Sequence, residues 1–244
     1  MNYYIPNNLL STENAKTSKG EKLGITTYIS YLSPHTQNSK GINLCPHASK
    51  GCAKACLFQS GSARFDAVQE GKMNKTEFFL ADRKAYMEKL YKELKRAERL
   101  HGAIEGDKQY KKNGVDVLRY KNFAVRLNGT TDIAFEKLKV KDNKNIMELF
   151  PNIQFYDYTK NPNRMYKYLK NELPSNYHLT FSRSEVNDDV CMDILSKGGN
   201  VAIVFGVKNV NDFPSEYGGY KVINGDETDL RFIDEDNVIV GLKY

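Results

Sequence analysis

The order of apolar and polar residues predicts a chain that alternates between strands and helices. Apolar, β-rich runs occur in the second half at residues 122–127, 153–158, 177–182, 200–205, 220–223 and 237–242. Stretches with helix-like spacing, at 134–150, 161–171 and 185–198, separate the first four of these runs. Strand–helix–strand spacing of this kind favours parallel βαβ units.

The first half of the chain predicts one strand and one long helix. Residues 24–32 are β-branched and aromatic with alternation, which is typical of a strand. Residues 74–100 carry apolar side chains at helical spacing, and Asn74 with Glu77 predicts a capping box at the start of that helix. Residues 101–116 are polar and predict a surface connection.

These elements predict an α/β fold, a partial or complete (βα) barrel with mostly parallel strands. An open doubly wound sheet is the alternative. The 244 residues, 40% of them hydrophobic, suffice for one substantial core. Since no linker, repeat or low-complexity tract interrupts the chain, we expect a single domain over residues 1–244.

Polar and charged residues gather immediately after four of the predicted strands. The four groups are Asn128, Thr130, Thr131 and Asp132; Asp157, Thr159 and Lys160; Ser182, Arg183, Ser184 and Glu185; and Asn224, Asp226, Asp229 and Arg231. In a parallel barrel the strand carboxyl ends meet at one mouth, where active sites are built. The alternative is a structural network of helix caps and ion pairs, because Asp, Ser and Asn also start helices.

An active site at that mouth predicts specific roles. The candidate catalytic residues are the carboxylates Glu185, Asp157 and Asp226. Candidate substrate- or cofactor-binding residues are Asn128, Asp132, Lys160, Ser182, Arg183, Asp229 and Arg231. Among them Arg183 and Lys160 suit a carboxylate or phosphate, since a guanidinium offers a two-pronged hydrogen-bonding fork. His178 falls within a strand and is expected to be a core histidine.

Composition and charge allow an anionic partner without requiring one. The net charge is +6, which permits a nucleotide or a nucleic acid, but the lysines are scattered as on a solvated surface. The amino-terminal segment lacks a signal pattern, and no run approaches a membrane span. We therefore expect a cytoplasmic protein with no membrane partner.

Three of the four cysteines lie within residues 43–61, which we predict to be a metal loop. Cys45, Cys52 and Cys56 have the spacing Cys-x6-Cys-x3-Cys, and the flanking lysines, glycine and proline are unlike a packed core. Thiolates are soft ligands that suit zinc and iron–sulfur clusters. Four cysteines are too few for a disulfide framework in a chain of this length.

The number and the location of the ligands distinguish two possible metal centres. A structural zinc site needs four closed ligands, and the fourth would be His47, His35 or Cys191, of which Cys191 is predicted to be a packed thiol within a helix. A [4Fe–4S] cluster held by three cysteines leaves one iron open to substrate or cofactor. Because the loop follows the first predicted barrel strand, the open cluster is favoured, and zinc is the alternative.

Two resemblances accompany this interpretation. A three-cysteine loop after the first strand of a partial (βα) barrel resembles the radical S-adenosylmethionine enzymes over residues 24–205, which implies S-adenosylmethionine as a cofactor and a reductant protein as a partner. The motifs "LCPHASKGCAKACL", "RFDAVQ", "FYDYTKNP", "NYHLTFSRSE" and "NGDETDLRF" are similar to an uncharacterised family of bacteriophage proteins, the gene product 88-like family. That resemblance implies a location in the phage-infected host cell.

Three functions are compatible with these features. The first is an iron–sulfur enzyme that acts on a small molecule, a nucleotide or a nucleic acid. The second is a metal-dependent hydrolase or nuclease stabilised by zinc. The third is a non-enzymatic, zinc-containing nucleic-acid-binding protein. The polar residues predicted at the strand ends favour an enzyme, because a binding module does not need them.

Overall fold

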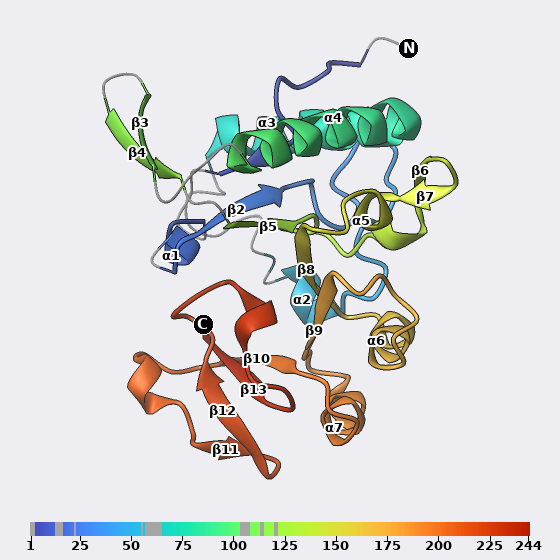
Figure 1. The fold of residues 1–244 in the computed structure, drawn as a ribbon. Helices are drawn as coiled ribbons and strands as arrows, with labels where there is room; N and C mark the ends of the chain where they lie inside the picture. Colours follow the sequence, from blue (N-terminus) through green and yellow to red (C-terminus); the bar gives the residue numbers. More distant parts are fainter. Residues whose placement is uncertain are drawn as a thin grey trace.

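A computed structural model describes residues 3–12, 17–21, 23–54, 56, 65–102, 108–112, 115–119 and 122–244. Its largest element is a twisted sheet of nine described strands (Figure 1). In spatial order these are β1 (Leu10–Ser11), β2 (Ile25–Ser30), β5 (Asn122–Arg126), β8 (Gln154–Thr159), β9 (Tyr177–Ser182), β10 (Val201–Phe205), β13 (Ile239–Lys243), β12 (Tyr220–Asn224) and β11 (Glu216–Tyr217).

The sheet is mostly parallel, as predicted. Only β1 and β11, at its two edges, run antiparallel to their neighbours among the described strands. From β2 to β10 the strands follow one another in a single direction, unlike a doubly wound sheet, which reverses at a switch point. The nine strands form an open sheet with two edges, and no closed barrel is found in the described part of the chain.

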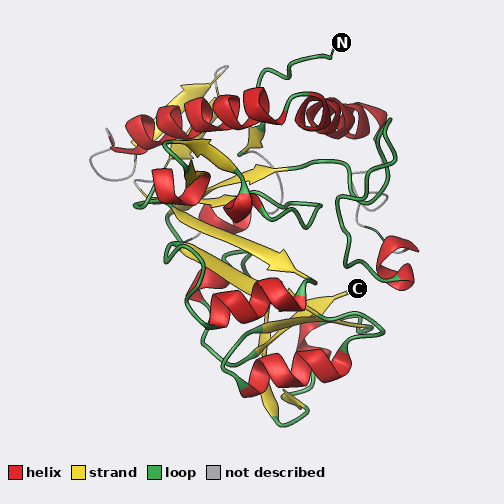
Figure 2. Cartoon of the chain, turned by 90° about the vertical axis from the view of Figure 1, so that its right-hand side faces the viewer, coloured by secondary structure: helices red, strands yellow, loops and turns green. Residues whose placement is uncertain are grey.

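Helices cover one face of this sheet (Figure 2). Right-handed crossovers between successive parallel strands that progress in one direction bring the connecting helices to the same face. They are α3 (Asp66–Ala81), α4 (Arg83–Gly102), α5 (Ile146–Leu149), α6 (Pro162–Leu169) and α7 (Asp188–Ser196). Tyr86, Leu90 and Ile194 from these helices share a buried core with Phe155 and Leu179 from the sheet.

The opposite face of the sheet is covered by shorter elements. The helix α1 (Thr17–Glu21) contacts β2, and the 3-10 helix η5 (Arg231–Ile233) contacts β8 and β9. A second, smaller core of Ala124, Tyr156 and Leu230 lies here. The remaining described elements are α2 (Lys50–Lys54), η3 (Phe135–Lys137), η4 (Val210–Asp212), the β3 (Lys108–Lys112) and β4 (Val115–Arg119) hairpin, and the β6 (Lys139–Lys141) and β7 (Lys144–Asn145) hairpin.

The predicted long helix is wrong in its boundaries. The helical segment starts at Asp66, so Asn74 lies inside α3 and caps nothing. The Glu77 carboxylate instead accepts hydrogen bonds from the amide and hydroxyl of Ser39, 2.7 and 2.5 Å away. The segment divides at Asp82, which leaves helical geometry and whose Oδ1 accepts the Ala85 amide at 2.9 Å. Asp82 thus ends α3 and caps α4, as Asp does at helix starts.

The region predicted as a polar connection contains regular structure. Residues 108–112 form β3, and β4 begins at Val115, so part of the predicted connection belongs to an antiparallel hairpin. Residues 103–107 and 113–114 of this region lie outside the described residues. No described helix has the length and apolar character that a membrane span requires.

Candidate functional site

The first thiol of the predicted metal loop is held between two strand-end loops. The Cys45 sulfur lies 3.5 Å from the His35 amide, in the segment after β2, and 3.7 Å from the Thr130 carbonyl oxygen, in the segment after β5. The amide of Asp132 also donates to the Leu44 carbonyl at 3.0 Å. We call residues 43–54 together with Cys56 the thiol loop. The contacts of Cys45 and Leu44 fix the start of this loop against the carboxyl end of β5.

The second thiol lies in the short helix α2, which is attached to the segment after β9. Ser49 caps α2, since its hydroxyl oxygen accepts the Cys52 amide at 3.1 Å. The Glu185 carboxylate accepts the Gly51 amide at 2.7 Å and the Ser49 hydroxyl at 2.6 Å. Glu185 therefore connects the thiol loop to the carboxyl end of β9.

The three thiols lie within electrostatic reach of one another. The pKa of Cys45 is raised to about 11, mainly by burial; the His35 amide opposes the rise, and the charges of Asp132, Cys56 and Cys52 add to it. Burial also raises the pKa of Cys52, which the Lys160 ammonium opposes. In the part of the chain that the structure describes, no three His, Cys, Asp or Glu side chains converge closely enough to hold a metal ion. Residues 57–61 of the predicted metal loop, and Ala55, lie outside the described residues.

Asp132 and Lys160 join the loops that follow β5, β8 and β9. Asp132 accepts hydrogen bonds from the Thr159 hydroxyl at 2.9 Å, the Lys160 amide at 2.9 Å and the Arg164 guanidinium at 2.7 Å. The Lys160 ammonium donates to the Ser182 hydroxyl at 2.5 Å and to the Arg183 carbonyl at 3.3 Å. Because Thr159 pairs with Phe181 in the parallel register, Lys160 and Ser182 leave the sheet at the same edge. The strand-end clusters after these three strands therefore come together.

Asp157 is placed differently from the other candidate carboxylates. It is fully buried on the helix-covered side of β8, where burial raises its pKa to about 6. It accepts the Asn128 amide at 2.7 Å, the Asn128 side-chain nitrogen at 3.0 Å and the Tyr177 hydroxyl at 2.8 Å. Asp157 holds the Asn128 turn in place, and the side-chain oxygen of Asn128 in turn accepts the Thr131 hydroxyl and the Ile133 amide.

Arg183 is directed toward α7. Its guanidinium pairs with Asp188 at 2.5 Å and lies 5.7 Å from the Tyr217 ring. The Asp188 hydrogen bond raises the pKa of Arg183 further above its ordinary value. The Arg183 side chain is thus engaged by groups of α7 and β11.

The fourth predicted cluster contains Asp226, Asp229 and Arg231. These residues make contacts near β12 and β13 and on the face of the sheet opposite the helices. Asp226 accepts the Lys243 amide at 2.8 Å, and its carbonyl accepts the Lys19 ammonium. Asp229 pairs with Arg126 at 2.8 Å, and Arg231 is completely buried, 3.3 Å from Asp234. The loops after β5, β8 and β9 thus meet the thiol loop directly, whereas these three residues contact other segments.

Sequence reasoning missed two residues of this site, Lys72 and Ser49. Lys72, in α3, is nearly buried, with its ammonium 5.9 Å from the Tyr31 ring centroid, and the charge of Cys56 opposes the lowering of its pKa by burial. Ser49 positions the thiol loop, as does Thr130 from the predicted cluster after β5. Ser49 could have been found, since a serine before a short helical segment is a common N-cap. Lys72 carries no such local signal, because its partners are distant in the chain.

A family model described as "Gene product 88" matches residues 8–244. The chain belongs to the gene product 88 family. This confirms the resemblance to gene product 88-like bacteriophage proteins that the sequence motifs predicted. No curated protein and no solved structure matches this gene product 88 family member.

Proposed function

We propose that this protein is an iron–sulfur enzyme of the radical S-adenosylmethionine type, in which Cys45, Cys52 and Cys56 bind a [4Fe–4S] cluster. The observation that supports it is the position of the thiol loop. The loop follows β2 and contacts the carboxyl-end loops of β5 and β9, through Thr130 and Glu185. Active sites of (βα) folds are built from loops at that edge of the strands.

The donor set fits a cluster with one open iron. Three sulfurs lie on one loop, and the fourth cysteine of the chain, Cys191, is fully buried in α7, where its thiol contacts the Asn187 side-chain oxygen at 3.6 Å. Thiols with raised pKa values become ligands only when a cationic metal displaces their protons, so binding is accompanied by proton release. Binding also requires the sulfurs of Cys45, Cys52 and Cys56 to come closer together than they are in the described part of the chain.

The strand order supports a partial (βα) barrel, the fold of the radical S-adenosylmethionine enzymes. A parallel sheet whose strands progress in one direction, with helices on one face, is the arrangement expected for a partial (βα) barrel with an open mouth. The resemblance implies that S-adenosylmethionine binds at the open iron. A cluster of this kind supplies single electrons, which a reductant protein must deliver.

The residues beside the thiol loop would bind an anionic group of the cofactor or of a small-molecule or nucleotide substrate. Lys160 is the best candidate, because its ammonium lies at the Ser182 hydroxyl and its charge reaches the Cys52 sulfur. Glu185 and Asp132 act by positioning the thiol loop and Lys160. The catalytic roles of Asp157 and Asp226 and the binding roles of Asp229 and Arg231 stay predictions.

Metal and sulfide analysis of anaerobically purified protein tests the proposal. We expect iron and acid-labile sulfide at about four each per chain, with thiolate-to-iron charge-transfer absorption. Replacing Cys45, Cys52 or Cys56 by Ser should abolish the absorption. Cys191→Ser, which removes the one cysteine outside the loop, should retain it.

Two results would overturn the proposal. A colourless protein with one zinc per chain would favour a structural zinc loop. Cleavage of DNA with added Mg²⁺ and no reductant would favour a metal-dependent nuclease.

A further inference from the structure

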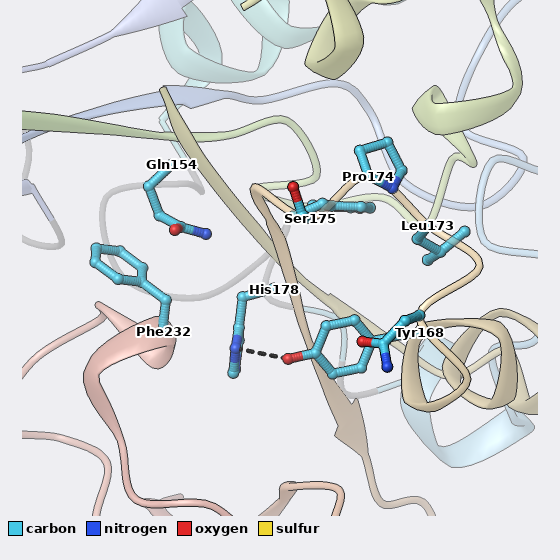
Figure 3. Close-up of a pocket in the computed structure, with 9 residues that line it drawn as sticks. Gln154, Tyr168, Leu173, Pro174, Ser175, His178 and Phe232 are labelled. Carbon is cyan, nitrogen blue, oxygen red and sulfur yellow. Dashed lines mark hydrogen bonds between the residues drawn. The ribbon is translucent and has the colours of Figure 1, made fainter. Parts of the chain in front are cut away.

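A pocket of about 270 Å³ opens at the amino-terminal edge of β8 and β9 (Figure 3). Gln154 is the first residue of β8, and Ser175 lies just before β9. Since β8 has six residues, a length of roughly 20 Å separates this edge from the edge where Lys160 lies. The pocket is therefore distinct from the thiol site, and the function proposed above does not use it.

Aromatic rings form the walls of the pocket. His178 and Tyr168 pack edge to face with centroids 5.6 Å apart, and the Tyr168 hydroxyl lies 3.0 Å from His178 Nδ1. Figure 3 shows Phe232 on the other side of His178. The Phe232 ring is itself supported by Tyr156, with centroids 5.5 Å apart. Rigid, supported rings of this kind are suited to stacking against a flat ligand.

The lining carries no formal charge at neutral pH. None of the nine residues that line the pocket is Lys, Arg, Asp or Glu, although 27% of the chain is charged. Burial lowers the pKa of His178 to about 4, so its imidazole is neutral. A phosphate or carboxylate group would find no cation to pair with in this lining, so the pocket favours a neutral ligand.

Polar groups at fixed positions complete the pocket. The Gln154 side-chain nitrogen donates to the carbonyl oxygens of Phe155 at 2.8 Å and Asn176 at 3.2 Å, which fixes the orientation of the amide. Its side-chain oxygen is thereby left to accept from a ligand. Figure 3 shows this amide between Phe232 and His178, and the exposed Ser175 also lines the pocket. An oriented acceptor between rings recognises a planar molecule with N–H donors at its edge.

We propose that this pocket binds a neutral, planar heteroaromatic ring of nucleobase size, as the free base or the nucleoside. The ring stacks on Phe232 and donates a hydrogen bond to Gln154. The volume of about 270 Å³ lies just below the range of about 300–1,000 Å³ for pockets that hold drug-sized molecules, which suits one base better than a dinucleotide.

Titration of the full chain with the four common ribonucleosides tests the proposal. The binding is followed by calorimetry and by amide chemical shifts, with ribose alone as the negative control. We expect saturable binding of at least one nucleoside and none of ribose. The corresponding 5′-monophosphate should bind no more tightly than the nucleoside. Absence of saturable binding for all four, or a monophosphate that binds tenfold more tightly, would overturn the proposal.

Variants locate the binding. Phe232→Ala should weaken it at least tenfold. Phe213→Ala, which truncates a partly buried phenylalanine outside the pocket, should leave the affinity unchanged. Should Phe232→Ala fail to fold, Ser175→Phe blocks the pocket from its exposed rim and should abolish binding. Binding that survives both Phe232→Ala and Ser175→Phe would contradict the assigned pocket.

Discussion

The Glu185 carboxylate lies 2.7 Å from the backbone nitrogen of Gly51, although the two residues are 134 positions apart in the chain. This hydrogen bond attaches α2, which carries Cys52, to the segment after β9. A β-carbon at position 51 would lie 2.7–2.8 Å from the Glu185 carboxylate, closer than such contacts occur. A larger residue at position 51 would therefore displace the exposed carboxylate of Glu185 from the Gly51 amide.

Gly51→Ala is expected to detach the thiol loop. The added methyl group forces Glu185 away, so the amides of residues 49–54 should exchange with solvent at least tenfold faster, and the iron content should fall. Gly71→Ala is the matched control, because Gly71 also lies in a helix and its β-carbon would meet nothing within 4 Å. That substitution should stabilise α3 by about 1 kcal/mol. Equal exchange rates and iron contents in the two variants would contradict the anchoring role of Glu185.

Arg164→Lys is expected to be strongly destabilising. The Arg164 guanidinium is buried and binds Asp132 at 2.7 Å and Glu136 at 2.8 Å, so one fork holds two carboxylates. A lysine cannot reproduce that fork, and Glu136, which is also buried, would lose a partner. Loss of a partner from a buried ion pair costs about 3–5 kcal/mol, which urea unfolding measures. Arg183→Lys, at a partly exposed pair with Asp188, should change stability by about 1 kcal/mol or less.

The pair of Arg126 and Asp229 predicts strong coupling in a double-mutant cycle. The pair is nearly buried, with Arg126 Nη1 2.8 and 3.0 Å from the two Asp229 carboxylate oxygens, and the Tyr156 hydroxyl adds a contact at 3.3 Å. Arg126→Met and Asp229→Asn each leave the other member of the pair as a buried charge without its ion-pair partner, which is destabilising. The double variant should be more stable than the sum of the two losses predicts, by about 1 kcal/mol or more in unfolding free energy. Additive losses would show that the pair contributes nothing beyond its separate members.

Sequence patterns predicted the strands of this fold better than its helices and its site. The run at residues 177–182 coincides with β9, because β-branched and aromatic residues between turn signals are a local property. The division of the helix at Asp82 was missed, since apolar residues continue at helical spacing on both sides of it. Periodicity alone does not show that Asp82 caps α4.

The candidate site was likewise predicted in part from the sequence. Four strand-end clusters were expected to meet. Those after β5, β8 and β9 do, through Asp132, Lys160 and Glu185, whereas Asp226, Asp229 and Arg231 contact other segments. Parallel strand order makes this inference possible from sequence. Successive side chains of a strand point to opposite faces of the sheet. An uncertainty of one residue therefore leaves the face of each side chain undetermined from sequence. Asp157 was predicted as a catalytic carboxylate, and its side chain lies in the helix-covered core; its catalytic role stays a prediction.

The neutral state of His178 predicts a specific pH dependence of stability. Burial lowers its folded pKa to about 4, with Asp236 opposing the shift, Arg231 adding to it and the Tyr168 hydroxyl at Nδ1. Between pH 4 and its ordinary pKa of about 6.5, the unfolded chain binds a proton at this residue that the folded chain does not. The contribution of His178 to stability is therefore present above pH 6.5 and is lost as the pH falls toward 4.

The effect of Asp157 on the pH dependence of stability is opposite to that of His178 between about pH 4 and pH 6. Its folded pKa is raised to about 6, so its contribution is present below pH 4 and is lost as the pH rises toward 6. The two slopes oppose each other in the native protein. His178→Gln removes one of them, so its unfolding free energy should rise relative to the native protein as the pH is lowered from 6.5 to 4.5. Urea unfolding at several pH values measures this difference, and NMR titration of the His178 ring should give a midpoint near 4. A midpoint near 6.5, or parallel pH profiles of the two proteins, would show that the ring is solvated and the pocket open to protons.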